Sequence, residues 1–441
     1  MAIDRLGFSL KRVLLLLFGA IFVLGVAGGA AFFEYLFYLE DHPYRYYPGA
    51  IGGAILLLFS LTVFMFRRAQ GAKAVRSKLQ GFSLGLDFGN SSVKGVLVKG
   101  EKGEAKILAA GSEPLPAGVI SDTGLILRPK EAAEATRKLL RRLRASRVRH
   151  VVTTVSHGAA VIRLAQFPRM SRDELREALK WEAGQHLPLP PEQAVLDFDI
   201  LDPAGNSAQM TVFLAAVPRP VAEALLQTLR FSGFRPASIK AFDLEANSLA
   251  RALELFSFLP AGDDAAWAAL DLGAKSSKLT IFAGAIPQVT RSLSPGGDGL
   301  TELLSRELGL EPKAAEELKR QEGLEEGSRV RAVLWPQLEE LFMEVRRSLE
   351  YFLIQRRGAR LQRVFLLGGG AGLPGLALSL QDYLGATLSN RLGVENGFQV
   401  VVPFVPGDSL AQEKSRSAKK SGPGPLGAEY FIALGSALRS E

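Results

Sequence analysis

The chain has 441 residues, a net charge of +8 and no cysteine. Its length exceeds what a single hydrophobic core usually supports, so we expect at least two domains. The lack of cysteine excludes disulfides and cysteine-ligated metal sites, and the four scattered histidines argue against a His-rich metal site. The modest positive charge suits an anionic lipid surface or a nucleotide, and is poor evidence for nucleic-acid binding.

Two long apolar runs stand near the start of the chain, at residues 13–33 and 47–66. Each has the ~20 residues that a helix needs to cross a bilayer. Basic residues flank the outer ends of the pair, whereas the short link between the runs carries acidic residues and tyrosines. The positive-inside rule therefore predicts a two-span membrane hairpin and basic linker over residues 1–80, with the bulk of the protein on the cytoplasmic side of the inner membrane. A cleaved signal peptide is the alternative for the first run, and a buried pair of core helices is the alternative for both runs.

Residues 82–98, FSLGLDFGNSSVKGVLV, predict a β-hairpin whose first strand ends in Asp87. Small residues let the backbone of a turn approach a phosphate, and free N–H groups there bind anions. A carboxylate beside such a turn can hold Mg²⁺ through water. The turn residues here are Gly89, Asn90, Ser91 and Ser92. Many hairpins have such turns without a ligand, so this motif needs partners elsewhere in the chain.

Residues 81–256 alternate predicted strands and helices, which indicates an α/β domain with a mixed sheet. Ser171, with Glu174 three residues later, has the pattern of a helix capping box. Basic residues crowd the end of the helix expected at 130–145, either as a solvated face or as a contact with the membrane surface. The other expected helices run from Ser171 to Pro188, over 220–231 and over 241–256; the expected strands cover 149–155, 159–164, 197–201 and 210–217.

A second hairpin, at residues 267–282, repeats the pattern of the first. Asp271 ends its first strand, and the turn that follows includes Gly273, Ser276 and Ser277. A duplicated acid-tipped hairpin rarely arises by chance, so the two copies together predict a pair of phosphate-binding turns. Lys275 lies inside the second turn, and we expect its side chain to point into solvent.

The rest of the second half adds two motifs to these hairpins. A helix at 312–321 carries Glu316 and Lys319, and a strand at 364–367 runs into Gly368, Gly369 and Gly370. In isolation, the first motif could be a surface ion pair and the second an ordinary turn. Other expected features are a long helix at 335–356, a helix and a turn at Gly385 before a strand at 400–402, a flexible polar loop at 407–428, a closing helix at 430–439, and core positions for Trp181 and Trp335.

Taken in order, the two hairpins, AEELKR and FLLGGGAGLPGL resemble the actin/Hsp70/sugar-kinase ATPase superfamily. With FPRMSRDELREALKWEAGQHLPLPPEQAVLDFDIL and the closing FIALGSALR, residues 81–441 resemble the PilM family of actin-like type IV pilus assembly proteins, which are related to FtsA. The resemblance implies an α/β, actin-like ATPase fold of two RNase H-like domains. Their expected bounds are 81–256 and 257–441, with a small subdomain inserted at about 113–200.

The resemblance also implies that ATP and Mg²⁺ bind between the two domains. The first phosphate turn then comprises Asp87, Gly89, Asn90, Ser91, Ser92 and Lys94, and the second Asp271, Gly273, Ser276 and Ser277. Glu316 and Lys319 match the helix that contacts the nucleoside, and Gly368, Gly369 and Gly370 match the adenosine loop. Asp87 and Asp271 would hold Mg²⁺ through water, and Glu245 is the candidate to orient an attacking water.

The partner implied by the resemblance is the N-terminal peptide of a PilN-like inner-membrane protein, with other pilus inner-membrane components and self-association as further contacts. We expect ATP binding with weak or no hydrolysis, because the sequence offers no strong general base. A small-molecule kinase of the same fold and an FtsA-like filament-forming division protein are the alternatives. The N-terminal apolar runs, the long loop at 407–428 and Lys275 depart from the PilM pattern.

Overall fold

The computed structural model describes residues 81–439, apart from 101–104, 146–147, 149, 157, 188–189, 203–206, 261–264, 357, 393–397 and 406–425. The expected membrane hairpin and basic linker, residues 1–80, lie outside the described residues, as does most of the loop expected at 407–428. Among the helices that are described, none has both the length and the apolar character that a membrane span requires.

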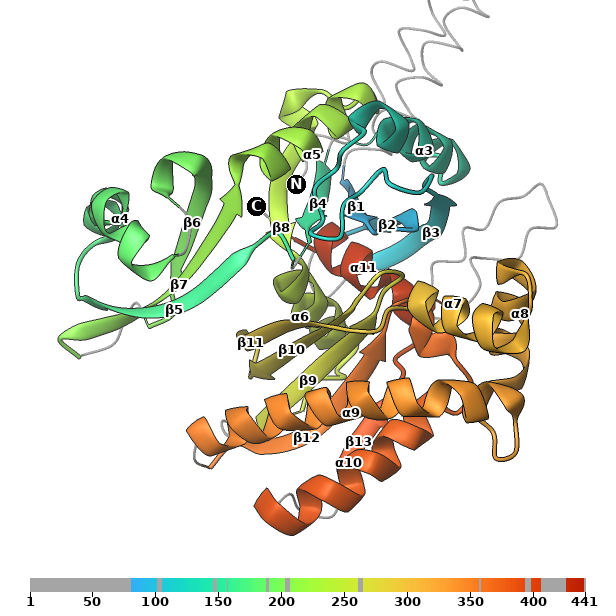
Figure 1. Ribbon diagram of the computed structural model, residues 1–441. Helices are drawn as coiled ribbons and strands as arrows, with labels where there is room; N and C mark the ends of the chain where they lie inside the picture. The colour runs from blue at the N-terminus through green and yellow to red at the C-terminus, as the bar shows by residue number, and fades with distance from the viewer. Residues whose placement is uncertain are drawn as a thin grey trace, which may run out of the picture. The chain divides into compact units, whose positions relative to one another are not determined.

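The first sheet has five strands in the order β3-β2-β1-β4-β8. Its first three strands, β1 (Phe82–Phe88), β2 (Ser92–Lys99) and β3 (Lys106–Pro114), form an antiparallel meander, and β4 (His150–Val155) and β8 (Ile239–Leu244) extend the sheet parallel to β1. Helices α3 (Pro129–Arg142) and α5 (Arg219–Phe231) pack on each other beside this sheet (Figure 1). Apolar residues of β2 alternate between two cores, which explains why both of its faces are apolar.

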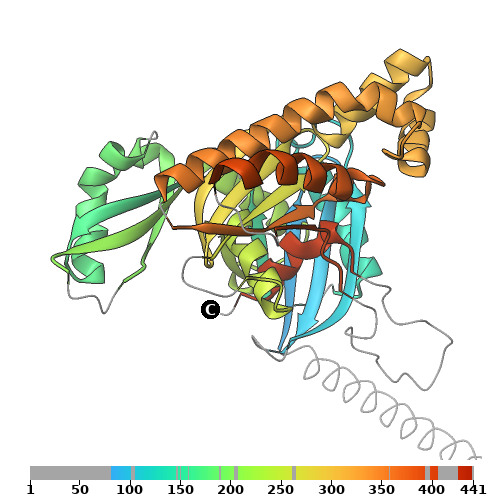
Figure 2. The same ribbon diagram turned by 90° about the horizontal axis from the view of Figure 1, so that it is seen from below.

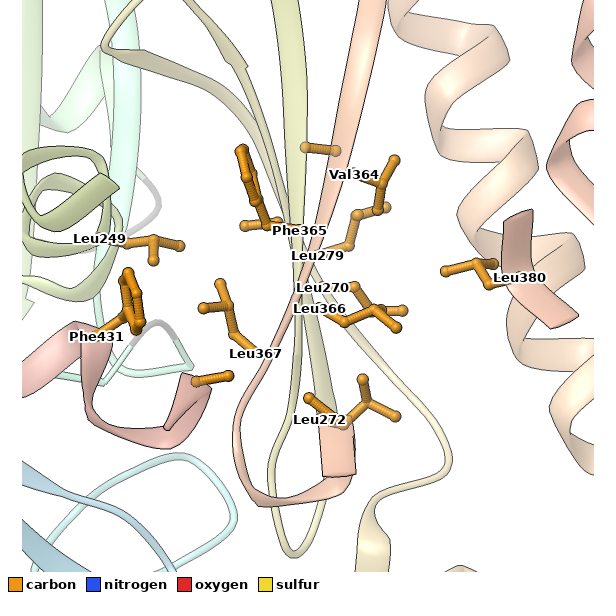
Figure 3. Close-up of a cluster of buried hydrophobic side chains, with 14 of the residues drawn as sticks. Leu249, Leu270, Leu272, Leu279, Val364, Phe365, Leu366, Leu367, Leu380 and Phe431 are labelled. Atoms are coloured by element: carbon orange, nitrogen blue, oxygen red, sulfur yellow. The ribbon is translucent and has the colours of Figure 1, made fainter. Parts of the chain in front are cut away.

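The second sheet repeats this order as β11-β10-β9-β12-β13. Its strands are β9 (Ala265–Leu272), β10 (Ser277–Ala283), β11 (Ile286–Leu293), β12 (Arg360–Leu367) and β13 (Gln399–Val401). The associated helices are α7 (Gly297–Leu308), α8 (Pro312–Glu322), α9 (Arg329–Gln355) and α10 (Leu376–Leu392), of which α9 and α10 lie side by side (Figure 2). In Figure 3, Leu249 and Phe431 lie on one side of β9 and β12, and Leu380 on the other. The repeated topology confirms the predicted α/β fold with two related sheets.

A third, smaller sheet has the order β5-β7-β6 and is entirely antiparallel. It consists of β5 (Val161–Pro168), β6 (Ala194–Ile200) and β7 (Gln209–Pro218), with α4 (Arg172–His186) beside it (Figure 1). The insertion therefore begins and ends later than the expected 113–200, because α3 and β4 belong with the first sheet. The capping box at the start of α4 is confirmed: Ser171 N–H donates to Glu174 at 2.8 Å, and Glu174 N–H donates to Ser171 Oγ at 3.3 Å.

Two helices connect the halves of the described chain. Helix α6 (Glu245–Leu255) follows β8, and the closing helix α11 (Phe431–Ala437) packs on α6 and on β1, β2 and β4. The end of the chain thus returns to the first sheet, so the expected second domain at 257–441 does not hold for its last helix. This packing places the buried Phe431 and Leu434 in the main hydrophobic core.

Four local predictions were wrong. Residues 241–244 form part of strand β8, because β4 offers a parallel partner that the local pattern does not reveal. Helix α9 begins at Arg329, where Ser328 caps it by accepting from Arg331 N–H at 2.9 Å. Helix α10 continues through Gly385 without a turn. Trp181 is not a core residue, since 85% of it is exposed.

Candidate functional site

The acid at the first hairpin turn faces a lysine on the opposite strand. Asp87 on β1 pairs in register with Lys94 on β2, and Lys94 Nζ lies 3.6 Å from Asp87 Oδ2. Thr154, near the end of β4, donates to Asp87 Oδ1 at 3.2 Å. Asp87 is only 4% exposed, so these partners hold a buried carboxylate at the end of the sheet.

The turn between β1 and β2 is closed by Gly89 N–H, which donates to Ser92 O at 3.1 Å. The Asn90 side chain donates to Ser121 O at 3.0 Å and so ties the turn to the segment after β3. Within the described part of the chain, the N–H groups of Asn90 and Ser91 have no acceptor. Free backbone donors in a fixed turn are typical of anion-binding turns, and phosphate binding at this turn stays a prediction.

The second hairpin reproduces this arrangement. Gly273 N–H donates to Ser276 O at 3.1 Å, and Asp271 pairs in register with Lys278. Ser277 is fully buried and its Oγ donates to Pro295 O at 2.5 Å, so its hydroxyl proton already has an acceptor within the protein. Lys275 is half-exposed and pairs with Asp298 at 3.3 Å, as expected for a side chain that points outward.

The glycine run lies directly against the end of β9. Gly368 has φ +77°, and a Cβ added there would lie 2.2 Å from Asp271 Oδ1 and 2.6 Å from Leu272 O. Only glycine fits this approach, which leads into the short helix η3 (Gly369–Gly372). Burial raises the pKa of Asp271, and attraction to Lys278 and Lys94 offsets this effect only in part.

Glu316 and Lys319 form a partly buried cluster rather than a surface pair. Lys319 is 8% exposed, and its Nζ lies 2.5 Å from Glu316 Oε2, 2.6 Å from Thr301 Oγ1 and 2.9 Å from Gly297 O. Burial acts to raise the pKa of Glu316, but hydrogen bonds from Lys319, Thr301 and Arg320 outweigh it and lower the pKa. The cluster fastens α8 to the first turn of α7, whose Gly297 N–H donates to Gly273 O in the second turn at 2.8 Å.

Lys278 is a site residue that the sequence reasoning missed. Its Nζ donates to both carboxylate oxygens of Glu245 at 2.9 and 3.0 Å, and to Ser156 Oγ at 3.2 Å. Burial acts to lower the pKa of Lys278, but the charges of Glu245 and Asp271 outweigh it and raise the pKa, so Lys278 stays protonated. A cavity of about 20 Å³ lined by Glu245, Asp271, Lys278 and Ile432 adjoins this pair. A signal was available: Lys278 follows Asp271 by the same interval that separates Lys94 from Asp87.

The structure thus gathers several predicted residues around one point. Asp87, Lys94, Glu245 and Asp271 lie close enough for their charges to interact. Gly368 adjoins Asp271, whereas Glu316 and Lys319 reach the second turn only through α7. Across the residues that the structure describes, no group of three acidic or histidine side chains is placed to hold a metal ion.

A family model described as type IV pilus assembly protein PilM matches residues 85–441. A chain in the solved PilM–PilN type IV pilus biogenesis complex is 32% identical, over 81% of this chain and 97% of that one, with a TM-score of 0.65. The ethanolamine utilization protein EutJ from Carboxydothermus hydrogenoformans is 17% identical over 81% of this chain and 89% of its own, with a TM-score of 0.47. MreB5 of Spiroplasma citri bound to AMPPNP is 13% identical over 69% and 89%, with a TM-score of 0.40.

Proposed function

Because the chain belongs to the PilM family of type IV pilus assembly proteins, we propose that it is a membrane-tethered, ATP-binding scaffold that binds a PilN-like partner. The observation that carries the nucleotide part is the duplicated turn, in which the same acid, lysine and glycine-closed turn recur at the ends of two related sheets. Two such turns on separate sheets can grip one polyphosphate from both sides.

The residues present fit an ATP·Mg²⁺ ligand. The free N–H groups of Asn90 and Ser91, with the Lys94 ammonium, supply donors and positive charge for phosphate oxygens. Asp87 and Asp271 would hold the hydrated ion, and Gly368–Gly370 would leave bare backbone against the adenine. When bound, the nucleotide supplies charge that bridges the two turns. Glu316 and Lys319 would contribute to the nucleoside side through α7 and α8.

We expect slow or absent hydrolysis because the sequence offers no strong general base. Glu245, the candidate to orient an attacking water, accepts two hydrogen bonds from Lys278. We therefore infer that bound nucleotide controls how closely the domains of the two five-stranded sheets approach each other, and that its hydrolysis is not the main function.

A direct test measures saturable binding of Mg·ATP by calorimetry, using residues 79–441, which form a compact unit by themselves. Wild-type protein is expected to bind, and Asp87→Ala with Asp271→Ala is expected to abolish binding. Lack of saturable binding by the wild-type unit would refute the nucleotide part of this proposal.

The small sheet with α4 is our proposed region for the PilN-like N-terminal peptide. Trp181 on α4 is 85% exposed and Val195 on β6 is 45% exposed, and exposed apolar side chains often mark contact surfaces. A fluorescent peptide from the partner should bind the wild-type unit and bind Trp181→Ala at least several-fold more weakly. Tyr351→Ala is the control, because Tyr351 is a 60%-exposed aromatic residue on α9, which belongs to neither the small sheet nor α4. Equal binding by both variants would exclude Trp181 from the contact.

The membrane tether is tested separately. We propose that residues 1–80 span the inner membrane twice and leave Gly81 on the cytoplasmic side, where the partner's N-terminal peptide also lies. Deleting residues 1–78 should release the protein from membranes of cells that lack the pilus partners. A reporter fused after residue 80 that scored as external would overturn this orientation.

A further inference from the structure

Lys278 links the second hairpin to the first sheet by a direct charged contact. It lies on β10, whereas its partner Ser156 immediately follows β4 and its partner Glu245 begins α6 immediately after β8. The three side chains thus come from two different sheets of one compact unit. A rearrangement between the sheets in this region must either keep or break the contacts of Lys278.

Around Lys278, acidic side chains outnumber basic ones. Three acids, Asp87, Glu245 and Asp271, and one further lysine, Lys94, interact electrostatically within the cluster. Lys94 and Lys278 each pair in register with the acid of their own hairpin, and each also interacts electrostatically with the acid of the other hairpin. A phosphate held by the two turns brings additional negative charge and oxygen acceptors to these same lysines. Lys278 then has two competing acceptors, the Glu245 carboxylate and the phosphate.

The position of Lys278 indicates which phosphate of a bound nucleoside triphosphate it would contact. The elements assigned to the nucleoside, Gly368–Gly370 and the Glu316–Lys319 cluster, lie by β9, α7 and α8. Lys278 Nζ instead bonds to groups that follow β4 and β8, and borders the cavity beside α6 and α11. A triphosphate whose nucleoside is held by those elements would approach this side with the phosphate farthest from the nucleoside, which is its terminal phosphate.

We propose that Lys278 recognises the terminal phosphate of a nucleoside triphosphate by exchanging its ion pair with Glu245 for that phosphate. This inference rests on the proposed ATP binding between the turns. Glu245 acts as the built-in competitor: it holds Lys278 until a stronger acceptor is present. A diphosphate leaves the Lys278–Glu245 pair in place, so the residue pair distinguishes ATP from ADP and couples that difference to the contact between the sheets.

The proposal predicts opposite effects for the two partners. Lys278→Met removes the ammonium and keeps the side-chain length, so affinity for Mg·ATP should fall roughly 10- to 100-fold while affinity for Mg·ADP changes less than about 2-fold. Glu245→Gln removes the competitor and frees Lys278, so affinity for Mg·ATP should rise. A purely structural ion pair predicts that both substitutions act in the same direction, through loss of folding stability.

The experiment is calorimetric titration of residues 79–441 with Mg·ATP and Mg·ADP, for wild type, Lys278→Met, Glu245→Gln and the double variant. The double variant removes both charges of the pair together and leaves Lys94 as the cation that interacts with Asp271, so it should fold while lacking ATP preference. Lys275→Met is the control, because Lys275 is a half-exposed lysine of the same hairpin and pairs with Asp298.

The outcomes separate this inference from the proposed function. Binding of neither nucleotide by the wild-type unit would refute nucleotide binding altogether. Binding of both, with an ATP-to-ADP preference that is unchanged in the folded double variant, would refute the role of Lys278 and leave nucleotide binding standing. A lower ATP affinity in Glu245→Gln would likewise overturn the competition between Glu245 and phosphate.

Discussion

The packing of the closing helix α11 gives a sharp test of the fold. Gly435 lies against α6, where a Cβ added at this position would be 1.6 Å from Ser248 O. Ordinary van der Waals contact begins at 3.4 Å, so Gly435→Ala requires the two helices to separate by nearly the difference. The obstructing atom belongs to the backbone, and Arg251 also holds the helices together by donating to Gly435 O at 2.6 Å. The backbones of α11 and α6 cannot move aside at this contact as the end of a flexible side chain would.

The expected cost exceeds the usual range for overpacking. Inserting a methyl group into a packed core costs about 1–3 kcal/mol, and a backbone obstruction places Gly435→Ala at or above ~3 kcal/mol. With an unfolding entropy near 2.1 cal/mol/K per residue, a unit of this length should lose roughly 4 °C or more in melting temperature. The measurement is thermal unfolding of residues 79–441 followed by circular dichroism.

The control is a second Gly→Ala substitution, for which the expected change in melting temperature has the opposite sign. Gly385 lies inside α10, and an added Cβ there meets nothing within 4 Å. Alanine is a better helix former by roughly 0.5–1 kcal/mol, so Gly385→Ala should raise the melting temperature slightly. If Gly435→Ala melted at or above the wild-type temperature, the described contact between α11 and α6 would be wrong.

Two further predictions concern stability against pH. Burial raises the pKa of Asp271 above its ordinary 3.8, so ionisation of this carboxyl lowers the stability of the folded protein as pH rises. Asp271→Asn should therefore have a higher melting temperature than wild type at pH 7. The difference in melting temperature should vanish below pH 3.8, where Asp271 is protonated in both the folded and the unfolded state. Hydrogen bonds lower the pKa of Glu316 below its ordinary 4.5, so Glu316→Gln should melt lower than wild type at pH 7, with the gap closing as pH falls through and below 4.5. Melting curves of both variants across this pH range test the signs, and a shared direction would contradict the assignment.

Local sequence was sufficient for the hairpins, because alternation and small turn residues act within a few positions of the chain. The Asp87 and Asp271 turns and the Ser171 capping box therefore appear where they were expected. Strand β8 could not be predicted from its own residues, since its state is decided by the parallel partner β4, more than eighty positions earlier. The return of α11 to the first sheet was hidden for the same reason.

In the candidate site, too, some residues could be predicted from local sequence and others could not. Repetition of a local motif predicts Asp87 and Asp271, the family resemblance adds Lys94, and the structure brings the three together. Lys278 was missed although it shares the spacing of Lys94, because its importance comes from Ser156 and Glu245, which approach it only in three dimensions. Glu245 was named as the residue to orient a water, whereas its carboxylate is occupied by Lys278.

Helix α6 connects the packing of α11 with the proposed phosphate contact. It carries Glu245 at its first position and Ser248 one turn later, and Ser248 is where Gly435 of α11 comes closest. Asp243, just before α6, accepts from both Arg251 of α6 and Arg439 beyond α11, at 2.8 and 2.9 Å. A displacement of α11 must therefore also move Glu245 relative to Lys278 on β10. If Lys278 leaves Glu245 for a phosphate, we expect α6 to shift and to displace the closing helix α11, because the two helices are packed on each other. A displacement of α11 would in turn reach β1 and the turn between β1 and β2, since α11 packs on both strands.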